Sequence, residues 1–243
     1  DIYYLAMIES GYNPNAYSRA HAAGMWQFIS STGRRYSLNQ TLWYDARRDP
    51  ELATHAACQY LRDLYDEFQS WNLAIAAYNC GEGRIRSRVR DNIFSFWNMR
   101  LPRETSAYVP RFLAALILMR NADIFGLPSE NQFYRPEPVE KIEITDCVTL
   151  RSVAKAANVP YQEIRRLNGV YRKGITPPTK GTKSFITLPQ RSVNTFYANY
   201  EKMPKNEKSG VVYHRVQRGE TLGYLARQYY SSIQEIMTIN NIR

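Results

Sequence analysis

Hydrophobic positions in the first half of the chain recur with helical spacing. Asp49 and Pro50 form a typical helix start, an N-cap carboxylate followed by a proline in the first turn. Apolar residues then return every four positions over 52–68. A second stretch, 112–119, is almost entirely apolar. The pattern predicts an all-α first domain with a helix beginning at residue 50, and a helix over 112–119 that is buried on most sides.

The second half of the chain repeats itself. Residues 141–168 align without gaps on residues 213–240, at an offset of 72. The identical pairs are Thr149/Thr221, Leu150/Leu222, Ala154/Ala226, Gln162/Gln234, Glu163/Glu235, Ile164/Ile236 and Asn168/Asn240. Each copy predicts a short strand (142–144 and 214–216), a turn and two short helices, and the first copy adds a strand over 184–188. We therefore expect two small βααβ modules, the second truncated at Arg243.

Charge shifts where the repeat region begins. Residues 1–135 contain 15 Arg, no Lys and 13 acidic residues (net +2), whereas 136–243 contain 17 basic and 9 acidic residues (net +8). Pro136 and Pro138 would break a helix at this shift, and 202–210 has linker composition. The sequence thus predicts a multidomain α+β chain. Its expected parts are a helical domain over 1–135, a module over 139–190, a linker over 191–210 and a truncated module over 211–243.

The overall composition is that of an ordinary globular protein. Apolar residues make up 44% of the chain, which excludes disordered and collagen-like classes. No apolar run approaches the roughly 20 residues of a membrane span. The chain starts at Asp1 without a signal peptide, which we interpret as a fragment lacking its targeting segment. The net charge of +10 predicts an anionic partner: nucleic acid, a membrane surface or a carboxylate-bearing polymer.

Cysteine usage argues against metal or disulfide chemistry. Cys58, Cys80 and Cys147 are too few and too scattered for a disulfide framework or a metal site. We expect them to be small buried hydrophobic residues. With only three histidines in addition, we predict no metal and no other cofactor.

Glu9 is the candidate acid of the first domain. It follows the apolar face of an N-terminal helix and precedes a Ser10-Gly11 turn. Desolvation by apolar neighbours raises the pKa of a carboxyl group, as a general acid requires. The alternative is a solvated glutamate at a helix end.

Two glycine-containing segments, 24–28 and 77–83, combine aromatic and amide side chains that suit sugar rings and acetamido groups. For their aromatic residues, the alternative to sugar binding is packing in the core. Gln27 and Asn79 are harder to explain as core.

These segments resemble the ordered motifs of the family 1 lytic transglycosylases, which have a goose-lysozyme-like SLT domain. The matching residues are Glu9-Ser10, Asn13–Ala16, Ser18, Gly24–Phe28, Thr32-Gly33, Ala77–Asn79, Gly81, Glu104-Thr105 and Tyr108-Val109. The segment 43–50 narrows the resemblance to the D branch of the membrane-bound members. The duplicated modules resemble LysM domains through Gly219–Leu222 and Asn240, although the first copy replaces the usual glycine turn with Asp146–Leu150.

The resemblance implies an all-α lysozyme-like domain, followed by LysM modules, that cleaves the β-1,4 bond between N-acetylmuramic acid and N-acetylglucosamine. Glu9 would protonate the leaving oxygen and then act as base on the muramyl 6-hydroxyl, which closes a 1,6-anhydro ring. Tyr78 would hydrogen-bond Glu9 or the nearby substrate. The implied substrate-binding residues are Ser18, Met25, Gln27, Tyr78, Asn79, Glu104 and Tyr108.

The implied partner is the peptidoglycan glycan strand, in the periplasm or cell envelope. Membrane attachment would come only through a missing N-terminal anchor, and the protein would be a monomer that does not bind nucleic acid. Asp45 and Asp49 are the nearest candidates for a second acid, but we expect a structural role for each: Asp49 as a helix cap and Asp45 paired with Arg47 or Arg48.

Three other functions compete with this interpretation. A muramidase of the same fold would use water and leave a reducing end. A catalytically inactive protein would only bind glycan. A nucleic-acid binder would use the mixed basic and aromatic cluster Tyr161, Arg165, Arg166, Tyr171, Arg172 and Lys173.

Overall fold

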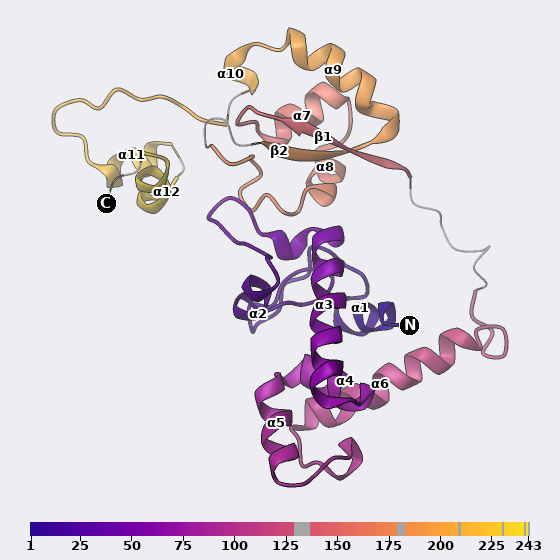
Figure 1. The fold of residues 1–243 in the computed structure, drawn as a ribbon. Helices are drawn as coiled ribbons and strands as arrows, with labels where there is room; N and C mark the ends of the chain where they lie inside the picture. The colour runs from indigo at the N-terminus through magenta and orange to yellow at the C-terminus, as the bar shows by residue number, and fades with distance from the viewer. Residues whose placement is uncertain (129–136, 179–182, 209, 230, 241, 243) are drawn as a thin grey trace. The chain divides into compact units, whose positions relative to one another are not determined.

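The computed structural model describes residues 1–243 except 129–136, 179–182, 209, 230, 241 and 243. The chain divides into two compact units (Figure 1). The first unit comprises Asp1–Gln40 and Ala46–Arg135, and the second comprises Thr41–Asp45 and Pro136–Arg243. In the described residues, no helix combines the length and apolar character needed to cross a membrane.

The first unit is built from helices, and among its described residues only isolated β-bridges interrupt the helical pattern. Its helices are α1 (Tyr3–Ser10), α2 (Ser30–Arg35), α3 (Pro50–Phe68), α4 (Trp71–Cys80), α5 (Glu82–Arg90) and α6 (Arg103–Arg120), with 3-10 turns at Ala46–Arg48 and Phe96–Asn98. The long helix α3 runs through the unit (Figure 1). The predicted all-α character of this part is confirmed.

The start of α3 follows the local chemistry of its sequence. The Asp49 carboxylate accepts hydrogen bonds from the backbone N–H groups of Glu51 and Leu52, and Pro50 occupies the first turn. Buried positions along the helix, including Leu61 and Leu64, then face the core of the unit. The capping role expected of Asp49 is confirmed.

Helix α6 departs from its sequence prediction. Phe112 and Ala115 are buried, but Ile117 is 55% exposed and Leu118 is 41% exposed. The helix contacts α1 and α4. An apolar run alone does not say how much of a helix is covered by neighbours. The expectation that 112–119 is buried on most sides was therefore wrong.

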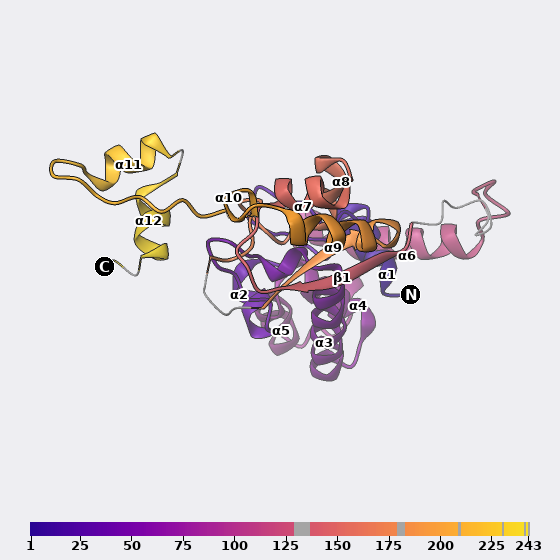
Figure 2. The same cartoon turned by 90° about the horizontal axis from the view of Figure 1, so that it is seen from above.

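The second unit contains a two-stranded sheet covered by helices (Figure 2). Strands β1 (Val139–Ile144) and β2 (Ser184–Pro189) pair antiparallel, with Ile142 opposite Ile186. Helices α7 (Leu150–Ala157) and α8 (Tyr161–Leu167) lie between the strands in sequence. The predicted βααβ order of the first module is confirmed.

Two features of the second unit differ from expectation. Part of the interval 191–210, expected to be a linker, forms α9 (Val193–Lys202), and Phe196 of this helix is 1% exposed within the core that α7 lines. In Figures 1 and 2, α9 runs beside α7. The expected strand over 214–216 is not formed. No residue after 189 in the described part of the second unit is assigned to a strand.

The second repeat nevertheless keeps the helices and the cap of the first. It forms α11 (Leu222–Gln228) and α12 (Ile233–Ile239), preceded by the short α10 (Lys205–Lys208). The Thr149 side chain accepts a hydrogen bond from Ser152 N–H at the start of α7, and Thr221 accepts one from Tyr224 N–H at the start of α11. Equivalent caps at the 72-residue offset are what a duplicated module requires.

Candidate active site

Glu9 lies in the last turn of α1, where the helix is pinned to a neighbouring loop. Gly11 ends the helix in the left-handed conformation, with φ of 59°. The Ser10 hydroxyl donates to the carbonyl of Met25 over 2.8 Å. Glu9 is thus half-buried at a fixed helix end, beside the glycine-containing segment 24–28.

Tyr108 is the direct partner of Glu9. Its hydroxyl, from the buried face of α6, donates a hydrogen bond to Glu9 Oε1 over 2.5 Å. Desolvation raises the pKa of Glu9 to about 7, against the lowering effect of the Tyr108 hydrogen bond, and the charge of Glu104 raises it further. A carboxyl group with this pKa is largely protonated below pH 7 and can still lose its proton near neutrality.

The segment 24–28 is held in a defined turn by its own backbone. Gly24 has φ of +85°, and a Cβ atom there would lie 1.7 Å from the carbonyl oxygen of Arg47. Gln27 has φ of 49°, and its side-chain Nε2 donates to the carbonyl of Gly24 over 2.7 Å. The amide expected to bind sugar is therefore engaged with its own loop in this state.

Tyr78 forms a second hydrogen bond to a backbone carbonyl of this segment. Its hydroxyl donates to the carbonyl of Trp26 over 2.8 Å, and its ring packs against those of Phe28 and Tyr60. Burial and the charge of Glu9 raise the pKa of Tyr78 well above its ordinary value. Of the two roles considered for Tyr78, the hydrogen bond to Glu9 is made by Tyr108 instead.

Core packing is the correct interpretation for two aromatic residues of the segment. Trp26 and Phe28 are 2% and 3% exposed, and Trp26 Nε1 donates to Thr54 Oγ1 over 2.9 Å. A fully buried ring offers no face for stacking on a sugar.

The remaining predicted residues lie at different places in the first unit. Asn79 Oδ1 accepts a hydrogen bond from Thr105 Oγ1 over 2.8 Å, so a side-chain bond joins α4 to α6 one residue after Tyr78. Glu104 is exposed in the first turn of α6. Ser18 is half-buried and accepts from Ala22 N–H within its own turn.

Sequence reasoning assigned no role to Ser10 or Thr105, although both stand in its motifs. Thr105 lies three positions before Tyr108 on a helix, so the two side chains share a face. This spacing indicated that both side chains leave α6 on the same side, where Thr105 reaches Asn79 and Tyr108 reaches Glu9. Ser10 carried no comparable signal, because its acceptor, the carbonyl of Met25, is backbone.

The cysteines do not follow the expectation of burial. Cys58 is exposed, whereas Cys80 and Cys147 are intermediate. Cys58 lies on α3 at a position outside its apolar stripe, which explains the error. Burial raises the pKa of the Cys80 thiol, so this residue beside the site is not an activated nucleophile. Within the described ranges, no group of three or more His, Cys, Asp or Glu side chains could hold a metal ion.

Comparison with known families divides the chain into three matches. The Transglycosylase SLT domain matches residues 1–95, the "Lytic transglycosylase MltD, LysM-like domain" matches 139–205, and the LysM domain matches 214–243. Glu9, Tyr78 and Asn79 fall within the first match. Tyr108 and Glu104 lie beyond its end, on α6.

Two relatives from the sequence comparison agree with these matches. Membrane-bound lytic murein transglycosylase D of Escherichia coli (strain K12) is 31% identical over 262 residues, which cover 98% of this chain and 56% of that protein. Peptidoglycan transglycosylase gp16 of Escherichia phage T7 is 40% identical over 83 residues, covering 33% of this chain and 6% of the phage protein. The crystal structure of the 70 kDa soluble lytic transglycosylase of Escherichia coli aligns with a TM-score of 0.41 and 24% identity, covering 54% of this chain and 23% of that one.

The chain spans about half the length of the Escherichia coli relative, whereas almost the whole chain is matched. The order of the three family matches is the order predicted from the motifs and the repeat. The chain carries a transglycosylase SLT domain followed by LysM-like domains, and it is similar along almost its whole length to a membrane-bound lytic murein transglycosylase D.

Proposed function

We propose that the protein cleaves the β-1,4 bond between N-acetylmuramic acid and N-acetylglucosamine in peptidoglycan without consuming water. The observation that carries this proposal is the environment of Glu9. A half-buried carboxyl group with a pKa of about 7 and a hydrogen bond from Tyr108 is suited to give up a proton and take one back. The relatives are named for transglycosylases of murein and peptidoglycan, which supports the same substrate.

The proposed reaction needs only one carboxyl group. Glu9 gives its proton to the glycosidic oxygen, the bond from C1 of the muramyl residue to that oxygen breaks, and the N-acetylglucosamine end leaves with a hydroxyl group. The Glu9 carboxylate then removes the proton of the muramyl 6-hydroxyl, whose oxygen bonds to C1. The product is a 1,6-anhydro ring, and Glu9 is protonated again.

The environments of the other candidate acidic residues support a single-carboxyl mechanism. Glycosidases that use two carboxylates place the second one either to bind water or to attack C1. Asp49 is engaged as the cap of α3, and Asp45 is 2% exposed within the second unit. Glu104 is exposed, and its negative charge raises the pKa of Glu9, which favours the protonated acid.

Substrate binding is proposed for the residues around Glu9 and for the LysM-like modules. Met25, Gln27 and Tyr78 belong to the turn and ring cluster beside Glu9, and Asn79 is held by α6. Gln27 would exchange its bond to Gly24 for an acetamido group of the sugar. The net charge of +8 over 136–243 favours a polymer whose stem peptides carry carboxylates. The proposed location is the cell envelope, where this polymer lies.

The mass of the products decides between the proposal and its rival. Purified peptidoglycan is digested with the full chain, and the soluble fragments are measured by mass spectrometry. Anhydro-muramyl ends, one water lighter than reducing ends, are expected. Reducing ends alone would show a muramidase that admits water, and the mechanism proposed here would be wrong.

Substituting the acid tests the assignment of Glu9. Glu9→Gln is expected to abolish cleavage while the protein still sediments with cell-wall sacculi. Glu67→Gln is the matched control, because Glu67 is an exposed glutamate of the same unit, paired with Arg86. An unchanged cleavage rate in Glu9→Gln would reject Glu9 as the acid, and absence of cleavage by the unmodified chain would favour a protein that only binds glycan.

A further inference from the structure

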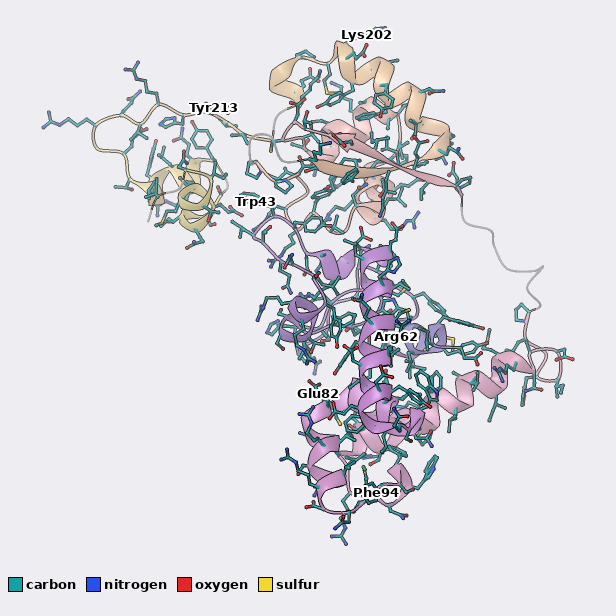
Figure 3. All side chains as sticks on the ribbon, viewed as in Figure 1. Trp43, Arg62, Glu82, Phe94, Lys202 and Tyr213 are labelled. Atoms are coloured by element: carbon teal, nitrogen blue, oxygen red, sulfur yellow. The ribbon has the colours of Figure 1, made fainter. Side chains whose placement is uncertain are left out.

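Five residues from the middle of the helical half belong to the second unit. Thr41–Asp45 lies in sequence between α2 and the 3-10 turn at Ala46–Arg48, yet it groups with Pro136–Arg243. The base of this excursion is closed in the first unit by a hydrogen bond from Ala46 N–H to the carbonyl of Asn39. Trp43, labelled in Figure 3, is at its centre.

The backbone of this segment pairs with a turn of the LysM-like domain. Arg172 N–H donates to the carbonyl of Trp43 over 2.8 Å, and Asp45 N–H donates to the carbonyl of Val170 over 2.9 Å. Tyr44 and Tyr171 stand opposite each other between these bonds as an isolated antiparallel bridge. The segment therefore pairs with the turn 170–172 through its backbone, in the way that an added β-strand pairs with the edge of a sheet.

Side chains extend this backbone pairing into the core. The rings of Tyr44 and Tyr171 meet edge to face, with centroids 5.8 Å apart. Tyr171 is 2% exposed, and its hydroxyl donates to the carbonyl of Phe185 on β2. Tyr44 therefore packs on a residue that is itself fixed to the sheet, and it contacts the same apolar core. The Arg172 guanidinium donates to the carbonyl of Thr41 over 3.0 Å.

Hydrogen bonds within the segment also hold it in the conformation that makes this contact. The Thr41 hydroxyl oxygen accepts hydrogen bonds from the N–H groups of both Trp43 and Tyr44. Thr41 N–H in turn donates to the carbonyl of Tyr44. A loop that is already ordered loses less conformational entropy when it binds.

We propose that Thr41–Asp45 is a docking segment whose partner is the turn 170–172 of the LysM-like domain. The proposal gives the motif over 43–50 a structural role in place of a catalytic one. Its first residues bind the turn 170–172, and its last two, Asp49 and Pro50, start α3. It also implies that the edge at 170–172 is occupied by the chain itself and is not a place where a glycan binds. The inference does not depend on the proposed reaction.

Amide hydrogen exchange on the full chain tests the proposal directly. The N–H groups of Asp45 and Arg172 are expected to exchange at least about tenfold more slowly than those of exposed loops. Adding a tetramer of N-acetylglucosamine is expected to leave both rates unchanged. Fast exchange of these two amides in the unmodified chain, or their release by the sugar, would overturn the proposal.

Two variants separate the docking contact from the fold of the domain. Tyr44→Ala removes the ring contact, and Arg172→Ala removes the guanidinium bond while keeping the backbone N–H. Each is expected to accelerate exchange at Asp45 about tenfold or more. The amide of Thr176, which donates to the carbonyl of Val148, reports on the domain itself and is expected to stay protected in at least Arg172→Ala.

Tyr213→Ala is the matched control, because Tyr213 is a tyrosine of the same unit that is 94% exposed (Figure 3). It is expected to leave the Asp45 and Arg172 amides protected. If neither docking variant changes exchange at Asp45, or if the control variant changes it equally, the segment is not held by this turn and the proposal fails.

Discussion

The hydroxyl of Tyr108 donates a hydrogen bond to Glu9 Oε1 over 2.5 Å and so joins α6 to the last turn of α1. Two opposing effects act on Glu9 through its surroundings. Desolvation disfavours the carboxylate, and the Tyr108 donor favours it. Desolvation is the larger effect, which leaves the pKa at about 7 rather than at the ordinary 4.5. The pH dependence of the proposed reaction therefore depends on both residues.

Tyr108→Phe is expected to move the pH profile upward. The substitution removes the donor that stabilises the carboxylate, so the pKa of Glu9 rises above about 7, by roughly one unit. Because the proposed acid must start protonated, activity falls as pH rises through this pKa. The alkaline limb of the profile, measured as release of soluble fragments from peptidoglycan, should shift to higher pH.

Tyr78→Phe supplies the comparison, since Tyr78 donates to the carbonyl of Trp26 and not to Glu9. Its alkaline limb is expected to stay close to that of the unmodified protein. Equal shifts in both variants would show that the Tyr108 hydrogen bond does not set the pKa of Glu9.

Glu9→Gln is expected to stabilise the protein at high pH only. A raised pKa means that the folded state binds the proton more tightly than the unfolded state, so folding stability falls as pH rises from about 4.5 to about 7. Glutamine does not ionise and avoids this loss. Because Glu9 is only half-buried, we expect a gain of about 2 kcal/mol at pH 8 and no gain at pH 4.

Chemical denaturation at the two pH values measures this difference. Glu67→Gln, at an exposed position, should show no such pH-dependent gain. A stability difference for Glu9→Gln that is the same at pH 4 and pH 8 would mean that the pKa of Glu9 is not raised by folding.

The sequence pattern was sufficient for features with a local cause. Asp49 and Pro50 define the start of α3 through contacts within four residues. The repeat aligned Thr149 with Thr221, and the structure shows that both residues cap a helix. The order of the domains was predictable for a similar reason. Each family motif is a short contiguous segment, so the order of the motifs along the sequence gives the order of the domains.

Features that depend on packing at a distance were not predictable. Tyr78 and Tyr108 are both motif tyrosines, and only the placement of α6 on α1 shows which of them reaches Glu9. Phe196 lies in a stretch expected to be a linker, and its burial follows from the packing of α9 against α7. The pairing of Tyr44 with Tyr171 spans more than a hundred residues and has no sequence signature.

Asp49→Ala is expected to destabilise the first unit by about 1 kcal/mol, because the first turn of α3 loses the acceptor for Glu51 and Leu52 N–H. Asp66→Ala removes an exposed aspartate from the same helix without touching the cap, and it should change stability by less than about 0.5 kcal/mol. Urea denaturation of both variants measures the difference. Equal effects would mean that the cap contributes no more than any surface aspartate.

Gly24→Ala and Gly81→Ala separate a steric clash from backbone strain. Both glycines have positive φ, +85° and +86°, so alanine is strained to a similar degree in each. A Cβ atom at Gly24 would overlap the carbonyl oxygen of Arg47, a backbone atom that cannot turn aside, whereas at Gly81 nothing lies within 4 Å. Gly81→Ala should therefore cost about 1 kcal/mol and Gly24→Ala more than about 3 kcal/mol.

The Gly24→Ala variant also tests the proposed site. Displacement of Gly24 would move the Met25 and Trp26 carbonyls that hold Ser10 and Tyr78 beside Glu9. Cleavage by Gly24→Ala should accordingly fall by about tenfold or more at a temperature where the protein is still folded, since small misplacements of catalytic groups are costly. Thermal unfolding followed by circular dichroism establishes that temperature. Full cleavage by folded Gly24→Ala would show that the segment 24–28 does not position the catalytic glutamate.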